Sequence, residues 1–107
     1  MGITCLSIVD IQYSGMIKSF RCPDTRALFE TGKSRRWSAI IKVATRKLTQ
    51  LDAAATLEFL RSPPGNRLES LTGDRDGQHS IRINDQWRIC FVWETDGVAH
   101  VEIVDYH

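Results

Sequence analysis

The spacing of apolar residues changes from a helical period to a strand period near residue 63. Between Trp37 and Leu51, apolar residues recur at steps of three and four, which forms one apolar stripe along a helix. From residue 80 onward they recur at every second position, ending with Val101 and Ile103, as in strands with one buried face. The sequence therefore predicts an α+β domain, with helices packed on one face of a mainly antiparallel sheet of four or five strands.

Local start and stop signals place the expected elements. Residues 16–20, Met-Ile-Lys-Ser-Phe, predict a first strand. Asp24 and Thr25 favour the start of a short helix that Gly32 ends. The two prolines in residues 62–65 end the helical half, because proline removes an amide donor and disfavours helical geometry before it.

Short polar segments predict tight turns in the second half, at residues 84–85 and 95–97. The strands between them would form an antiparallel meander. In the longer helix the basic side chains are expected to lie mainly outside the apolar stripe; they are Lys42, Arg46 and Lys47.

The domain is predicted to span residues 16–107, with residues 1–15 as an N-terminal extension that is disordered or lies outside the native domain. The alternation of Leu6 and Ile8 leaves open the alternative of an ordered extra strand. A chain of 107 residues with 42% apolar and 25% charged residues is typical of one small globular domain.

Composition excludes several classes of protein. A formal charge of +1 is too small for a non-specific nucleic-acid coat, so RNA binding would need local basic clusters. Cys5, Cys22 and Cys90 form no CxxC pair, which argues against a disulfide framework or zinc site and favours a reducing cytoplasm. We expect no signal peptide or membrane-spanning segment, and the sequence contains no HExxH, GxGxxG or Walker A motif.

The candidate functional side chains lie mainly on the predicted strands. Their alternation places Arg82 and Arg88 on the same, exposed side of neighbouring strands, where guanidinium groups can bind phosphate. The sequence Asp105-Tyr106-His107 puts three titratable side chains at a strand end. Solvated arginines and a frayed, inert histidine are the alternatives. The candidate RNA- or ribosome-binding residues are Arg46, Lys47, Arg67, Arg75 and Arg82.

Three motifs in this order resemble HigB-type toxins of the RelE/ParE toxin–antitoxin superfamily. They are Leu71-Thr-Gly-Asp-Arg-Asp-Gly77, Trp87-Arg-Ile-Cys-Phe91 and the final Asp-Tyr-His. The resemblance covers residues 16–107 and implies a RelE-like fold and a ribosome-dependent mRNA endoribonuclease that needs no metal or other cofactor. It also implies that Arg88 stabilises the transition state and that Asp105, Tyr106 and His107 form the terminal catalytic group.

Two positions depart from the resemblance. Glu69 stands where better-known HigB toxins have a histidine, and Thr72 stands where they have a lysine. Glu69 can act as a carboxylate base, but it brings no positive charge to phosphate. We therefore expect slower cleavage or a different codon preference.

The resemblance also implies partners: a HigA-type helix-turn-helix antitoxin, the 70S ribosome and mRNA, with operator DNA reached only through the antitoxin and no membrane. Two other functions remain open. A ParE-like toxin would inhibit DNA gyrase and would not depend on His107. A non-catalytic module would block translation by occupying the ribosome or RNA without cutting it.

Overall fold

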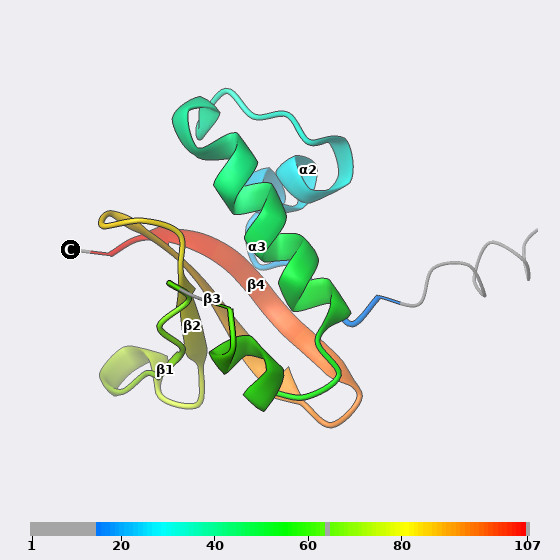
Figure 1. Cartoon of the computed structure of the whole chain (residues 1–107), viewed down its shortest axis with the longest axis vertical. Helices are drawn as coiled ribbons and strands as arrows, with labels where there is room; N and C mark the ends of the chain where they lie inside the picture. Colours follow the sequence, from blue (N-terminus) through cyan, green and yellow to red (C-terminus); the bar gives the residue numbers. More distant parts are fainter. Residues whose placement is uncertain (1–14, 64, 107) are drawn as a thin grey trace, which may run out of the picture.

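The computed structural model describes residues 15–63 and 65–106, and within them helices lie against one face of a four-stranded sheet (Figure 1). The helices are α2 (Pro23–Thr31) and α3 (Ile41–Ala53). The strands are β1 (Glu69–Ser70), β2 (His79–Arg82), β3 (Trp87–Glu94) and β4 (Gly97–Asp105). Short 3-10 helices span Ser38–Ile40, Glu58–Arg61 and Gly73–Arg75. This arrangement confirms the α+β prediction.

The sheet is antiparallel throughout, with the strand order β1-β2-β3-β4. Its register aligns Ile81 with Ile89 and Ile89 with Ile103, so these side chains share the face under the helices. The turn predicted at residues 84–85 is confirmed. Asn84 stabilises it, because its Oδ1 accepts hydrogen bonds of 2.8 Å from the backbone amides of Gln86 and Trp87.

The segment predicted as the first strand runs parallel to β4 but pairs with it only at isolated bridges. These bridges join Ile17 to Val98 and Phe20 to Val101. The amide of Lys18 donates to the Val98 carbonyl at 2.6 Å. The segment therefore covers the outer edge of β4, where unpaired backbone groups would otherwise be exposed. Of the predicted extension, residues 1–14 lie outside the described part of the chain.

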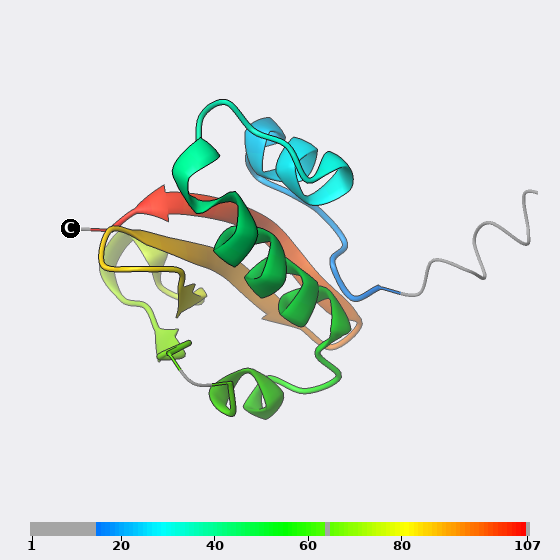
Figure 2. The same ribbon diagram turned by 45° about the horizontal axis from the view of Figure 1, so that its top comes forward.

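Helix α3 provides the apolar stripe that the sequence predicts. Trp37, just before it, and Ala44, Leu48 and Leu51 within it are buried against the sheet. Each fully buried leucine contributes roughly 1.5–3 kcal/mol of hydrophobic stabilisation. Figure 2 shows α3 lying across the sheet with α2 beside it. None of the helices in the described residues has the length and apolar character needed to cross a membrane.

Helix α2 begins and ends as its sequence indicates. Pro23 occupies its first turn, where a missing amide donor costs nothing. Gly32 ends the helix in the left-handed conformation at φ 72°, and its amide donates to the Leu28 carbonyl at 2.8 Å. On the face toward β4, the hydroxyl of Thr25 accepts a hydrogen bond of 3.1 Å from the Ile103 amide. This bond links α2 directly to the sheet.

Two sequence predictions about exposure are wrong. Lys47, expected outside the apolar stripe, is 4% exposed. The reason is that positions 44, 47, 48 and 51 share one face at helical spacing, so the charge of Lys47 did not keep it in solvent. Strand β3 was expected to have one exposed face, yet Arg88 and Cys90 on that side are 6% and 0% exposed. The reason is that the chain around Arg67 folds over this side of the sheet.

Candidate active site

The side of the sheet away from the helices carries the polar and charged residues. The register aligns Arg82 with Arg88, and Ser80 with both Glu69 and Cys90. Directly opposed strand residues point to the same face. Four segments that are distant in the sequence therefore contribute polar groups to one surface, called the polar face below; its residues are Glu69, Ser80, Arg82, Arg88, Cys90 and Glu102.

Arg88 lies at the centre of this polar face and is held by three hydrogen bonds. Its Nε donates to the hydroxyl of Ser80 at 2.7 Å. Its Nη2 donates to the carbonyl of Arg67 at 2.6 Å and to the carbonyl of Ser80 at 3.3 Å. Its Nη1 donates no hydrogen bond to any residue that the structure describes. The guanidinium is therefore fixed in orientation, and Nη1 is its one nitrogen without a hydrogen bond among the described residues.

Glu69 and Tyr106 lie beside the Arg88 guanidinium. Glu69 Oε1 is 3.8 Å from Arg88 Nη2, and its side chain is half exposed. The guanidinium carbon lies 5.3 Å from the centre of the Tyr106 ring, within the range of a cation–π contact. The structure thus brings together a permanent cation, a carboxylate and a phenol, three of the groups expected at the site.

The other two members of the predicted terminal group are placed differently. Asp105 pairs in register with Trp87 rather than with Arg88, so its side chain projects from the opposite side of the sheet. There Asp105 Oδ2 accepts a hydrogen bond of 3.1 Å from the side chain of Gln86. Asp105 and Arg88 therefore lie on opposite faces of the sheet. His107 lies outside the described residues.

The predicted RNA-binding residues differ in exposure and in whether their charge is already paired within the protein. Arg46 and Arg67 have exposed side chains. Arg82 forms an ion pair with Asp85 and retains a side-chain exposure of 29%. Lys47 is the exception, because it is buried and its ammonium donates to Asn66 Oδ1. Its assignment as an RNA-binding residue does not fit this burial.

Arg75 is held over the polar face by a residue that the sequence did not single out. Its Nη1 donates to Glu102 Oε2 at 2.9 Å and to Gln78 Oε1 at 3.1 Å. The hydrogen bond to Glu102 raises the pKa of Arg75 above its usual value. Beneath this pair, burial raises the pKa of the Cys90 thiol, which keeps the thiol neutral and poorly nucleophilic.

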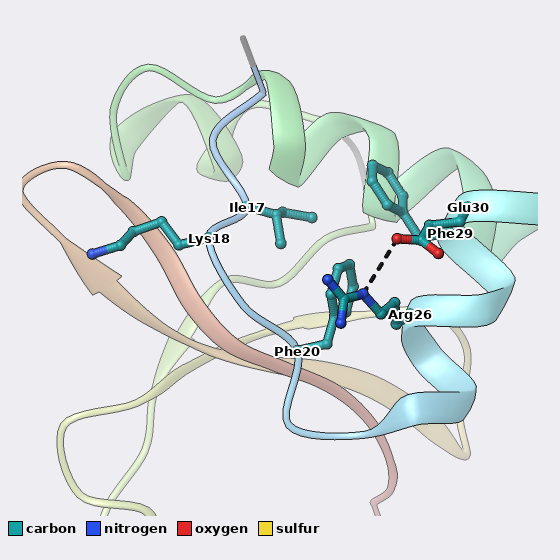
Figure 3. A pocket seen from close by; sticks show the side chains of 6 residues that line it. All are labelled: Ile17, Lys18, Phe20, Arg26, Phe29 and Glu30. Carbon is teal, nitrogen blue, oxygen red and sulfur yellow. Dashed lines mark hydrogen bonds and ion pairs between the residues drawn. The ribbon is translucent and has the colours of Figure 1, made fainter. Parts of the chain in front are cut away.

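A cleft of about 540 Å³ lies on another part of the molecule, between the N-terminal segment and α2 (Figure 3). Phe20 and Phe29 line it with their ring centres 5.7 Å apart. Arg26 stands above Phe20 and donates to Glu30 at 3.2 Å. The lining residues include none of those on the polar face, so this cleft is separate from the Arg88 site.

The sequence model of the HigB-like toxin family, described as RelE-like toxin of type II toxin–antitoxin system HigB, matches residues 18–107. The chain belongs to this family. It is therefore a RelE-like toxin of a type II toxin–antitoxin system, as the resemblance in the sequence implied.

Individual relatives of this HigB-like toxin agree with the assignment. Toxin HigB-1 of Vibrio cholerae is 49% identical over 70 residues, which cover 65% of this chain and 73% of that protein. Endoribonuclease HigB of Proteus vulgaris is 31% identical over 93 residues, covering 86% of this chain and all of that protein. The solved YoeB–YefM complex of Staphylococcus aureus matches the fold with a TM-score of 0.55 at 16% identity, covering 85% of this chain and 97% of that one.

Three residues that support the toxin's site were missed in the sequence. Ser80 alternates with apolar residues and resembles an ordinary exposed strand position, while Glu102 lies between Val101 and Ile103 in the same kind of pattern. Asn66 follows the prolines and resembles a loop residue. Ser80 and Glu102 both pair with Cys90, two positions after Arg88, and this shared face was the available signal, but the register depends on contacts across the sheet.

Proposed function

We propose that this toxin is a ribosome-dependent mRNA endoribonuclease whose active site is centred on Arg88. The observation that carries this proposal is the arrangement around one guanidinium: Glu69 is 3.8 Å away, Tyr106 is in cation–π range, and Nη1 makes no hydrogen bond to the described residues. Endoribonuclease activity is also the named function of the Proteus vulgaris relative. A guanidinium matches phosphate oxygens and keeps its charge at any physiological pH.

The reaction needs no group beyond those of the chain and the RNA. The ribose 2′-oxygen attacks the adjacent phosphorus, its proton passes to Glu69, and the bond from phosphorus to the 5′-oxygen of the next nucleotide breaks. Arg88 stabilises the negative charge that accumulates on the non-bridging oxygens, because a fixed cation costs no reorganisation during the reaction. His107, with Tyr106 in support, returns a proton to the leaving 5′-oxygen. The products are a 2′,3′-cyclic phosphate and a free 5′-hydroxyl.

Metal independence is part of this proposal, since Arg88 supplies the positive charge that a metal ion would otherwise bring. Cleavage should therefore persist when the toxin is treated with a chelator before it is added to ribosomes. A loss that only zinc or manganese restores would contradict this point.

The carboxylate at position 69 is expected to make this toxin slower than relatives with histidine there. A carboxylate can accept the 2′-hydroxyl proton, but it adds negative charge close to the phosphate. Thr72, which is exposed, likewise supplies no cation. Arg67, Arg75, Arg82 and Arg46 are the remaining basic residues proposed to hold the mRNA or the ribosome.

The proposed partner is a HigA-type helix-turn-helix antitoxin that reaches operator DNA and binds the toxin away from Arg88. The family is defined by its place in toxin–antitoxin pairs, and the fold neighbour was solved with YefM. Copurification of toxin with the adjacent antitoxin, followed by a binding assay with Arg88→Ala, would test the location. A loss of antitoxin binding in that variant would contradict it.

The deciding experiment is primer extension on a defined mRNA, with and without translating ribosomes. Wild type should cut only with ribosomes, while Arg88→Ala and His107→Ala should not cut. Arg26→Ala is the matched control, because Arg26 is an exposed arginine paired to Glu30 on α2, and it should cut normally. Uncut mRNA on stalled ribosomes would favour a non-catalytic blocker, and inhibition of gyrase supercoiling would favour a ParE-like toxin.

A further inference from the structure

Lys47 is a buried cation on the core-facing side of α3. It is 4% exposed, and its Nζ donates to Asn66 Oδ1. Burial lowers the pKa of Lys47, and the neighbouring charges of Arg46 and Arg82 lower it further. An ammonium group with three donors is costly to remove from water. Its presence in an apolar stripe needs a reason beyond packing, since a methionine would fill the same space.

Asn66, which accepts that hydrogen bond, is fully buried and bonded through its backbone and its side chain. Its Nδ2 donates to the carbonyl of Leu60 at 3.0 Å. Its own amide donates to the carbonyl of Pro63 at 3.3 Å, and its carbonyl accepts from the amide of Arg82 at 2.6 Å. Asn66 is thereby fixed between α3 and the Arg82 end of β2.

The next residue, Arg67, has an unusual backbone conformation that its neighbours maintain. Its φ is 45°, in the left-handed region that side chains disfavour. Such a conformation persists when the surrounding structure holds it in place. Asn66 holds it on one side, and on the other the Arg67 carbonyl accepts the 2.6 Å hydrogen bond from Arg88 Nη2. That bond is shorter than the 3.3 Å bond from the same nitrogen to Ser80.

We propose that Lys47 and Asn66 are positioning residues that fix the Arg67 carbonyl and, through it, the orientation of the Arg88 guanidinium. The connection runs from α3 around the edge of β2 to the polar face, through the Lys47–Asn66 hydrogen bond, the Asn66–Arg67 peptide and the Arg67–Arg88 hydrogen bond. Its catalytic consequence rests on the proposed role of Arg88 in RNA cleavage, whereas its structural consequence does not.

The test compares Lys47→Met with Lys42→Met, a change at an exposed lysine on the same helix. Single-turnover cleavage on ribosomes would separate kcat from KM at a temperature where both variants are folded. We expect Lys47→Met to lower kcat about tenfold or more, in the range for a displaced electrostatic group, with KM within about twofold. Lys42→Met should match wild type. In an Arg88→Ala background, Lys47→Met should cause no further loss.

A second readout does not depend on activity. In ¹⁵N-labelled toxin, the Arg88 Nε–H resonance should shift in Lys47→Met and remain in place in Lys42→Met. Wild-type cleavage or an unshifted Arg88 resonance in folded Lys47→Met would overturn the proposal. If wild type itself cuts no mRNA, the proposed function fails, and the resonance alone decides whether Lys47 positions Arg88.

Asn66→Asp covers the case in which Lys47→Met does not fold. It keeps an acceptor for Lys47 but loses the donor to Leu60. The positioning role predicts that Asn66→Asp, which retains the acceptor for Lys47, lowers kcat less than Asn66→Leu, which removes it, even where the two variants are equally destabilised. A purely structural role predicts that cleavage falls together with stability, and that result would overturn the proposal.

Discussion

Replacing Glu69 with glutamine should separate catalysis from stability. The change keeps the size of the side chain but removes the carboxylate that lies 3.8 Å from Arg88 Nη2. Since Glu69 is half exposed, its ion pair is screened by water, and its loss should cost about 1 kcal/mol or less. Loss of a general base typically lowers the rate by about 10²–10⁴-fold, which corresponds to roughly 3–5 kcal/mol of transition-state stabilisation.

Ribosome-dependent cleavage and urea unfolding measured on the same preparation would compare the two effects. Glu58→Gln is the matched control, because Glu58 is an exposed glutamate paired to Arg61 at 3.1 Å. Glu69→His should retain more cleavage than Glu69→Gln, since imidazole can also accept the proton. Cleavage by Glu69→Gln within about threefold of wild type, or a large loss in Glu69→His, would refute the role assigned to Glu69.

Three further outcomes are expected from other parts of the fold. Thr25→Val should lower the free energy of unfolding by about 1–3 kcal/mol because it removes the acceptor of the buried Ile103 amide. Thr25→Ser, which keeps the hydroxyl, should lower it less. Equal losses for the two variants in urea unfolding would contradict this. Burial lowers the pKa of His79 below 6.5, so the unfolded chain binds the proton more tightly and stability falls as the pH drops through about 6.5. His79→Phe should make stability depend less on pH between about pH 7 and 5. An unchanged pH dependence would exclude His79 as its source. Gly97→Ala would place a Cβ 2.6 Å from the Met16 carbonyl and should cost about 1–3 kcal/mol, with faster hydrogen exchange in the N-terminal segment; normal protection there would contradict it.

Much of the fold could be predicted because local rules and the tertiary structure agree. The two-residue alternation around Ile89 and Ile103 identified the strands, and Gly32 marked the end of α2 at a left-handed position. The N-terminal segment was harder, because it pairs with β4 only at two bridges and in parallel. Such pairing depends on residues about eighty positions away and leaves a weak local signal.

The site was predicted in its residue types more than in its geometry. Arg88 was identified, but its burial could not be foreseen because it depends on the chain at Arg67 folding over the sheet. Lys47 had the spacing of a core residue, yet its charge led to the opposite expectation. Asp105 was grouped with Tyr106 by proximity in sequence, whereas strand alternation sends neighbouring side chains to opposite faces.

The parallel pairing of the N-terminal segment with β4 also affects how fast the domain folds. Ser19 Oγ accepts a hydrogen bond from the amide of His100, eighty-one positions later. Contacts with such large sequence separation form late and slow the folding of a domain. The strand that carries this contact also leads directly into Tyr106, so the same stretch of chain covers the N-terminal segment and completes the surroundings of Arg88.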